Sequence, residues 1–445
     1  MPAAGSWDRL LASACERSGT PGAVLGVWHR GSRTVVPYGV LNTRTGVRTT
    51  GESVFQIGSI TKTWTATILA QLVEEGRLSL DSTVSDLLPG VRLGADDLAE
   101  QVTVRHLLTH SSGLDGDVFT DTGRGDDAVE RYVAGLHDVA VVHAPGQAYS
   151  YCNTGFVLLG RIIEVLDGTT WEESLRRRLV EPWDLPDVCT LPEEAIVRRA
   201  AAGHRDGEVV EPWGMPRSLG AAGLVTTTAA ALLAFGRRWL GEDVPPHLER
   251  MTDPLLEVPD GDDVDAVGLA WRLGTWAGHR VLGHSGGTNG QTAQLHVVPG
   301  LDLVVCVLTN SDAVNAVHDT VVPQVVADLT GVTVPSRPAP DPGAVPHDPT
   351  RHVGVYERRA VRLDVRADAA GLSVHIQPTG DFALGTPETV RLLPCDASGD
   401  RYVARSQDSE PWTPFTFSTL PDGTPQLFFS SRVAPLLSRL PRVDR

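Results

Sequence analysis

Lysine is almost absent from this sequence. Lys62 is the only lysine in 445 residues, and every other cationic position holds an arginine. A guanidinium stays charged at any pH that a protein meets, whereas an amine can lose its proton when its surroundings favour the neutral form. The retention of one amine therefore indicates that Lys62 serves for titration rather than for charge. The plainer alternative is a chance lysine on a helix surface.

Cysteine is also scarce. The five cysteines are widely separated and include no Cys-x-x-Cys pair, so the sequence predicts neither a disulfide framework nor a zinc site. His106 and His110 lie four residues apart, a spacing that zinc sites also use, but no third ligand is nearby. We therefore interpret both as local hydrogen-bonding histidines, and we expect no metal and no organic cofactor.

Basic clusters and long apolar runs are missing as well. The formal net charge is -17, and no basic patch is present to neutralise phosphates, so we expect no nucleic-acid partner. No apolar stretch is long enough to cross a bilayer. The first residues lack the basic segment followed by an apolar segment that marks a secretory signal. Together these absences predict a cytoplasmic protein with no membrane partner.

Ser59 and Lys62 stand at the start of a predicted helix. From Ser59 an apolar helical pattern runs to Gly76, whose lack of a Cβ suits a helix C-cap. Positions three apart share a helix face, so hydroxyl and amine can come within hydrogen-bond reach, as a serine nucleophile needs if an amine is to take its proton. A chain of this length should show roughly one Ser-x-x-Lys by chance. The isolation of Lys62 makes this one more specific.

The hydrophobic periodicity predicts strands near both ends of the first 330 residues and helices between them. The predicted helices are 7–17, 59–76, 156–166, 171–179, 229–240 and 314–329, and the predicted strands are 21–28, 34–40, 267–273, 280–282, 292–298 and 303–308. Residues 115–130 are rich in glycine and aspartate and show little periodicity. We expect a surface loop there.

A proline-rich segment divides the chain. Proline at the density of residues 334–350 prevents regular structure and indicates a linker. Beyond it, apolar and polar residues alternate in Val361–Val365 and Leu372–Ile376, a pattern typical of antiparallel strands. We therefore predict a larger domain at residues 1–333 and a small β-domain at residues 351–445.

Two further polar motifs follow along the chain. Tyr151-Cys-Asn153 precedes a predicted helix, and His284-Ser-Gly286-Gly287 lies between predicted strands. A phenol near an amine can share a proton with it, and an amide can orient the amine. Each motif also has a purely structural interpretation, in which Tyr151 and Asn153 cap the following helix and His284 shapes a turn.

Three separated segments, in this order, resemble one family, the serine penicillin-recognising enzymes, and among them the class C β-lactamase-like branch that includes esterases and D-aminopeptidases. The segments are Ser59-Ile-Thr-Lys62, Tyr151-Cys-Asn153 and His284-Ser-Gly286. The resemblance covers roughly residues 7–330, and residues 103–113 also resemble a signature of this branch. Three motifs in the right order are far more specific than any one of them.

The resemblance implies an α/β fold of the β-lactamase/transpeptidase kind. A mixed antiparallel sheet, made of N-terminal and C-terminal strands, would be flanked by helices, and an all-helical region from about residue 60 to 260 would form the other wall of a cleft. Residues 1–333 would be the serine hydrolase domain. The small β-domain would be a lipocalin-like, barrel-like unit that reaches over the cleft entrance, as in two-domain relatives.

The resemblance also implies a catalytic role for three side chains. Ser59 would be the nucleophile, helped by its place at a helix N-terminus, where the helix dipole favours negative charge. Lys62 would accept its proton, provided that burial lowers the amine's pKa. Tyr151 would serve as general base and then as acid toward the leaving group, because a phenol beside an ammonium ionises more easily.

Asn153 and His284 complete the expected catalytic residues, and Ser59, Gly286 and Gly287 are the expected oxyanion and substrate-binding residues. Asn153 would orient the lysine and contact a substrate amide, and the backbone N–H groups of Ser59 and Gly287 would form an oxyanion hole, with Gly286 and Gly287 allowing close approach. His284 departs from the family's Lys-Thr-Gly pattern, in which a permanent cation holds a carboxylate. A histidine is mostly neutral at pH 7, so the change favours esters, amides or peptides over β-lactams.

The expected reaction is acylation of Ser59 by a small-molecule or peptide substrate, followed by hydrolysis. Two alternatives remain. In one, a penicillin-binding-protein-type thioesterase takes a peptidyl group from a thioester or carrier protein and cyclises it by transfer to an amine. In the other, the fold is a non-catalytic ligand sensor.

Overall fold

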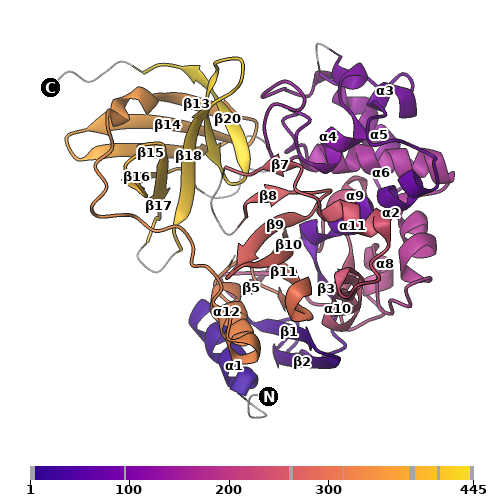
Figure 1. Cartoon of the computed structure of the whole chain (residues 1–445). Coiled ribbons are helices and arrows are strands. Elements are labelled where there is room, and N and C mark those ends of the chain that lie inside the picture. Colours follow the sequence, from indigo (N-terminus) through magenta and orange to yellow (C-terminus); the bar gives the residue numbers. More distant parts are fainter. Residues whose placement is uncertain are drawn as a thin grey trace.

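The computed structural model describes residues 6–94, 97–259, 264–313, 315–379, 386–407 and 411–440. The chain forms a larger part, built from a sheet and helices, and a smaller C-terminal barrel (Figure 1). The described chain begins with α1 (Ser6–Ser18), which lies beside α12 (His318–Thr330) at the lower end of the larger part (Figure 1).

Within the described residues, eight strands form one sheet in the order β2-β1-β12-β11-β10-β9-β8-β7, with antiparallel pairing throughout. The strands are β1 (Gly22–His29), β2 (Ser32–Gly39), β7 (Leu256–Glu257), β8 (Ala266–Val267), β9 (Arg272–Trp276), β10 (His279–Thr288), β11 (Gln291–Val298) and β12 (Leu303–Thr309). The first strand pairs with the last, with Gly26 opposite Cys306. Strands from both ends of the larger part therefore share one sheet, which confirms the predicted fold class.

Helices α1 (Ser6–Ser18) and α12 (His318–Thr330) cover one face of this sheet. Leu11 and Val325 belong to one buried apolar cluster with the strand residues Leu25 and Val305. The predicted helix at 314–329 corresponds to α12, and its first predicted residue, Val314, lies outside the described residues.

The other face of the sheet carries the helical region. Its helices are α2 (Thr61–Glu74), α3 (Val84–Leu87), α4 (Val104–Leu108), α5 (Ala128–Ala134), α6 (Asn153–Asp167), α7 (Trp171–Leu175), α8 (Pro192–Ala195), α9 (Gly220–Gly223), α10 (Ala229–Gly236) and α11 (Pro246–Glu249). The expectation that this region is all-helical is wrong in detail, because β3 (Phe55–Gln56) pairs with β6 (Thr226–Thr227) and β4 (His204–Arg205) pairs with β5 (Glu208–Val209). Among the described residues, no helix has both the length and the apolar character needed to cross a bilayer.

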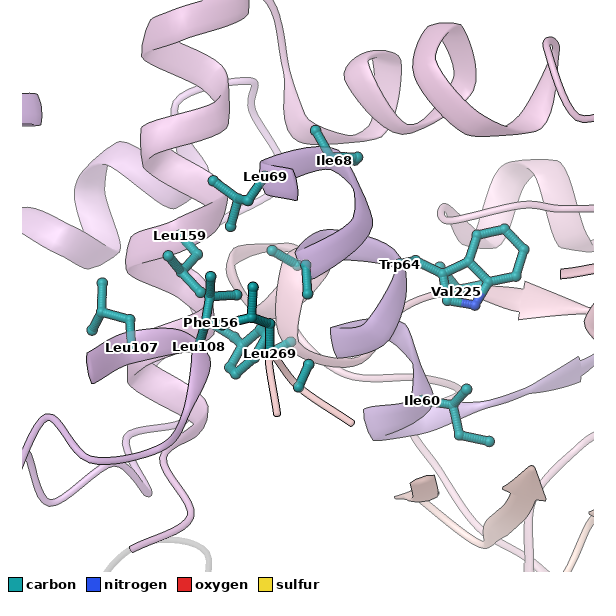
Figure 2. Packing of buried hydrophobic residues seen from close by; sticks show 14 of the residues in the cluster. Ile60, Trp64, Ile68, Leu69, Leu107, Leu108, Phe156, Leu159, Val225 and Leu269 are labelled. Carbon is teal, nitrogen blue, oxygen red and sulfur yellow. The ribbon is translucent and has the colours of Figure 1, made fainter. Parts of the chain in front are cut away.

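Helix α2 runs through the middle of the helical region and is buried on nearly all sides (Figure 2). Trp64 and Leu69 are fully buried, and the helix packs among side chains such as Phe156 and Leu159 of α6. Hydroxyls of its buried threonines donate hydrogen bonds to backbone carbonyls, as Thr65 does to Ala221 at 2.7 Å. Because threonine is a weak helix former, tertiary packing rather than intrinsic propensity stabilises α2.

The predicted strand at 267–273 is wrong, because the structure divides it between β8 and β9. Ala270 has a φ of +65°, and Gly268 N–H donates to the Trp271 carbonyl at 2.9 Å. This tight turn lets Trp271 leave the sheet and pack edge-on against Trp239, 5.0 Å away between ring centroids. Packing of one large aromatic side chain thus overrides a continuous apolar run.

The C-terminal part is a closed antiparallel barrel, which confirms the predicted barrel-like domain. Among its described residues, eight strands follow one another in sequence around the barrel. They are β13 (Gly354–Arg358), β14 (Val361–Asp368), β15 (Gly371–Pro378), β16 (Glu388–Pro394), β17 (Arg401–Ala404), β18 (Thr413–Thr419), β19 (Pro425–Phe429) and β20 (Arg432–Ser438). Pairing of Tyr356 with Leu436 closes the ring. The exact domain boundaries at 333 and 350 stay predictions.

The barrel docks on the larger part through the hairpin between β19 and β20. Ser430 and Ser431 both have positive φ, 54° and 61°, as a tight two-residue hairpin turn requires. Phe428 and Val433, on either side of this turn, share a buried apolar cluster with Tyr149 of the larger part. The hairpin therefore lies directly beside the Tyr151 motif.

Candidate active site

Ser59 lies in a 3-10 turn, Gly58–Ile60, that leads directly into α2. Strand β10 passes so close to this turn that Gly58 and Gly286 have no room for a side chain. A Cβ on Gly58 would lie 2.6 Å from Gly287 N, and a Cβ on Gly286 would lie 2.7 Å from Ser59 N. Glycine at these positions therefore lets the backbone amides of Ser59 and Gly287 lie near one another at the predicted oxyanion site.

Lys62 is completely buried, with 0% of its surface exposed. Its amine lies 3.1 Å from the Ser59 hydroxyl. It also contacts the Asn153 side-chain oxygen at 2.8 Å and the Ala222 carbonyl at 2.7 Å. The structure thus brings together the serine, the lysine and the asparagine that the sequence predicted.

The partners of Lys62 determine where its lone pair points. The Asn153 oxygen and the Ala222 carbonyl can only accept hydrogen bonds, so both require an N–H from the amine. In the neutral amine, the third direction, toward Ser59, then holds the lone pair. Burial, followed by the charge of Arg432, lowers the pKa of Lys62 well below its ordinary value, which favours this neutral form.

Tyr151 is partly buried beside the amine, with its hydroxyl oxygen buried, and Lys62 Nζ lies 5.0 Å from the centroid of its ring. The ring also stacks on His110 with 4.2 Å between centroids. Burial raises the pKa of the Tyr151 phenol above its ordinary value, while the Ser59 hydroxyl lowers it. Within the described residues the phenol forms no hydrogen bond of ordinary geometry, so Ser59 is close without being bonded to it. The phenol is therefore protonated at rest, in contrast to the expectation that a neighbouring ammonium eases its ionisation.

Asn153 is the first residue of α6, but it does not cap the helix. The cap is Cys152, whose sulfur accepts the Gly155 N–H at 3.2 Å. Burial raises the pKa of the Cys152 thiol to about 11, so this cysteine packs rather than reacts. The structural interpretation of Tyr151 and Asn153 as helix caps is therefore wrong, and both side chains point into the site.

His284 lies within β10 and is buried, so it does not shape a turn. Its Nδ1 lies 2.6 Å from the Ser285 carbonyl, and its ring centroid is 6.3 Å from that of Tyr151. Burial, together with the nearby Lys62, lowers the pKa of His284 to about 3. The ring is therefore neutral near pH 7 and offers no cation to a substrate carboxylate.

The two histidines with zinc-like spacing face different partners. Thr103 N–H donates to the His106 ring at 3.3 Å, and Cys152 N–H donates to the His110 ring at 3.0 Å. The prediction of local hydrogen-bonding roles is confirmed. In the part of the chain that the structure describes, no group of three or more metal-ligating side chains is positioned to hold a metal ion.

Sequence reasoning missed three charged residues at the edge of the site: Asp117, Arg358 and Arg432. The Asp117 carboxylate accepts a hydrogen bond from Asn153 Nδ2 at 3.1 Å. The predicted surface loop at 115–130 is thus wrong at its beginning, where Asp115 is only 6% exposed. Two aspartates among glycines gave no signal of burial, because their partners come from the barrel.

Comparison with known proteins agrees with this geometry. The family model described as Beta-lactamase matches residues 7–327. The chain belongs to the β-lactamase family. It is accordingly a serine hydrolase of that family, and the predicted family resemblance is confirmed.

Relatives of this β-lactamase-family protein include penicillin-binding protein 4 of Amycolatopsis lactamdurans, which is 39% identical over 79% of this chain and 97% of its own length. A solved structure of SurE is 26% identical, with a TM-score of 0.79 over 97% of this chain and 98% of that chain; SurE with D-Leu has a TM-score of 0.76 at 25% identity, over 97% of this chain and 99% of that chain. A D-stereospecific amidohydrolase from Streptomyces sp. is 26% identical, with a TM-score of 0.60 over 74% of this chain and 99% of that chain.

Proposed function

We propose that this protein cleaves ester or amide bonds through an acyl-Ser59 intermediate, and that its substrates carry a D-amino-acid residue. One observation carries the chemical part of the proposal: the amine of Lys62 has two acceptor-only partners and directs its third position at Ser59 Oγ, 3.1 Å away. This arrangement makes the serine a nucleophile without any metal or organic cofactor.

Acylation begins when Ser59 Oγ attacks the substrate carbonyl carbon and its proton moves to Lys62. The negative charge that develops on the carbonyl oxygen is stabilised by the backbone N–H groups of Ser59 and Gly287. As the bond to the leaving group breaks, the protonated Tyr151 phenol supplies a proton to that group. The Lys62 ammonium then returns a proton to Tyr151, so the pair ends as it began.

Deacylation repeats these transfers with water as the nucleophile. Water attacks the ester carbon of acyl-Ser59 while Lys62 accepts its proton. The Ser59 oxygen leaves and takes a proton from Tyr151, which Lys62 then restores. Asn153 keeps the amine of Lys62 oriented during both halves of the reaction. The neutral His284 does not itself supply a cation for a carboxylate on the acyl group, which favours esters, amides and peptides over carboxylate-bearing β-lactams.

The D-configuration is supported by the relatives. One was solved with D-Leu and another is a D-stereospecific amidohydrolase. We expect kcat/KM for p-nitrophenyl esters or anilides of D-amino acids to exceed that for the L-enantiomers by about tenfold or more, since a wrongly placed reacting carbonyl costs up to about 10²-fold. The measurement is a paired screen of D- and L-substrates with intact-mass detection of the acylated protein. Equal rates for both enantiomers would contradict the stereochemical part alone.

A second candidate changes only the acceptor. Similarity to SurE extends over 97% of this chain, barrel included, and the D-Leu found with SurE carries an amine that could attack an acyl-enzyme. The acyl group would then come from a peptidyl thioester, free or on a carrier protein. Incubation with such a thioester should give a cyclic product if an amine of the peptidyl group itself attacks acyl-Ser59, and only linear acid if water does. Stoichiometric acylation without turnover would instead support a ligand sensor.

A further inference from the structure

A cluster of buried charges joins the barrel to the candidate active site. Asp117 Oδ2 lies 3.1 Å from Arg358 Nη1 and 2.7 Å from Arg432 Nε. Arg432 Nη2 also donates to Asp117 Oδ1 at 2.9 Å. The side chains of Asp117 and Arg358 are each only 7% exposed. Burial alone would raise the pKa of Asp117, but the two arginines hold it below its ordinary value, so the group is a carboxylate.

Both arginines lie at one end of the barrel. Arg358 is the last residue of β13 and Arg432 is the first residue of β20, and these antiparallel strands are neighbours. The same end touches the Tyr151 motif, because Tyr151 N–H donates to the Ser431 carbonyl at 2.9 Å. The Arg432 guanidinium lies 5.0 Å from the centre of the Tyr151 ring. The position of this barrel end is therefore linked to the Tyr151–Asn153 segment.

Asp117 determines which way the Asn153 amide faces. A carboxylate only accepts hydrogen bonds, so the amide must turn its NH₂ toward Asp117, at 3.1 Å. The amide oxygen then faces Lys62, at 2.8 Å. The reverse orientation would place oxygen against carboxylate and NH₂ against the amine. By fixing the orientation of the Asn153 amide, Asp117 thus determines which atom of that amide bonds to the amine of Lys62.

We propose that Asp117 is a positioning residue for Ser59 acylation, and that Arg358 and Arg432 of the barrel hold it in place. The inference rests on the proposed function, because it takes Lys62 as the proton acceptor. In this arrangement the barrel is a structural part of the reaction machinery, since removing its arginines leaves a buried carboxylate without counter-charge. The oriented Asn153 amide would then lose its fixed partner.

The test compares Asp117→Asn with the full-length unchanged protein. An asparagine can donate or accept, so it no longer fixes the Asn153 amide, and we expect Ser59 acylation to slow by about tenfold or more. Acylation should rise with pH as Lys62 loses its proton. Because the variant removes a negative charge near that amine, the acid limb of the pH profile should move to lower pH while the plateau falls. A merely structural defect would lower the plateau without moving the limb.

Asp115→Asn is the matched control. Asp115 is a buried neighbour that accepts the Arg359 N–H at 2.6 Å, and it does not contact Asn153 in the described structure. Its variant should acylate within about threefold of the unchanged protein, because the Asn153 amide keeps its partner. Circular dichroism and thermal unfolding of both variants would show whether each is folded.

Arg358→Met provides an independent test of the link to the barrel. It should also slow acylation, and the double variant with Asp117→Asn should lose less than the product of the two single effects, as expected for residues in one network. Normal acylation in Asp117→Asn or Arg358→Met, or an equal loss in Asp115→Asn, would overturn the inference alone. Absence of Ser59 acylation in the unchanged protein would overturn the proposed function and this inference with it.

Discussion

Ser59→Ala should abolish covalent labelling by a fluorophosphonate probe and reduce p-nitrophenyl ester turnover to background. The reason is geometric: the Ser59 hydroxyl lies 3.1 Å from the amine of Lys62, in the 3-10 turn that leads into α2. An alanine offers no oxygen to form the acyl bond, and loss of a catalytic serine typically costs about 10⁶-fold in rate. Intact-mass spectrometry should show one added group on the unchanged protein and none on the variant.

Ser218→Ala is the control for this experiment. Ser218 is also a buried serine, but its hydroxyl donates to the Thr120 carbonyl at 2.8 Å and has no contact with Lys62 among the described residues. The control should be labelled like the unchanged protein. Retained labelling of Ser59→Ala would place the nucleophile on a different residue.

Lys62→Arg should be nearly as damaging, although it preserves the positive charge. A guanidinium does not lose its proton in proteins and cannot accept the one from Ser59. Removal of a general base typically costs about 10²–10⁴-fold, and the same loss is expected in kcat/KM for an activated ester. The larger side chain must also enter a site where Lys62 is 0% exposed.

Lys62→Met separates the loss of the base from steric conflict. Methionine is close to lysine in shape but has no amine, so this variant should be about as inactive as Lys62→Arg while fitting the site. Thermal unfolding measured beside activity distinguishes an inactive folded protein from an unfolded one. Substantial activity in Lys62→Arg would refute the role of proton acceptor.

The centre of the site was predictable because its partners are close in sequence or belong to recognisable motifs. Ser59 and Lys62 are three residues apart on one helix face, so local geometry alone places the two groups together. The shortage of lysine made Lys62 stand out. Tyr151 and Asn153 were found by motif order, and their distances to Lys62 agree with that reading.

The outer part of the site could not be predicted. Asp117 meets Arg358 from 241 positions away and Arg432 from 315 positions away. Charged residues are usually exposed, so a glycine- and aspartate-rich stretch is interpreted as a loop unless its partners are known. The raised pKa of Tyr151 was equally hidden, because it arises from burial in the folded site.

The most direct test of the account is the pKa of Lys62 itself. Since this is the only lysine in the chain, protein labelled with ¹³C- and ¹⁵N-lysine should give one set of side-chain NMR signals, which can be followed as the pH is changed. We predict a pKa well below the ordinary value of 10.5, in the direction set by burial, and coincident with the acid limb of Ser59 acylation. A pKa at or above 10.5 would mean that the amine is an ammonium at rest and would contradict its role as the group that activates Ser59.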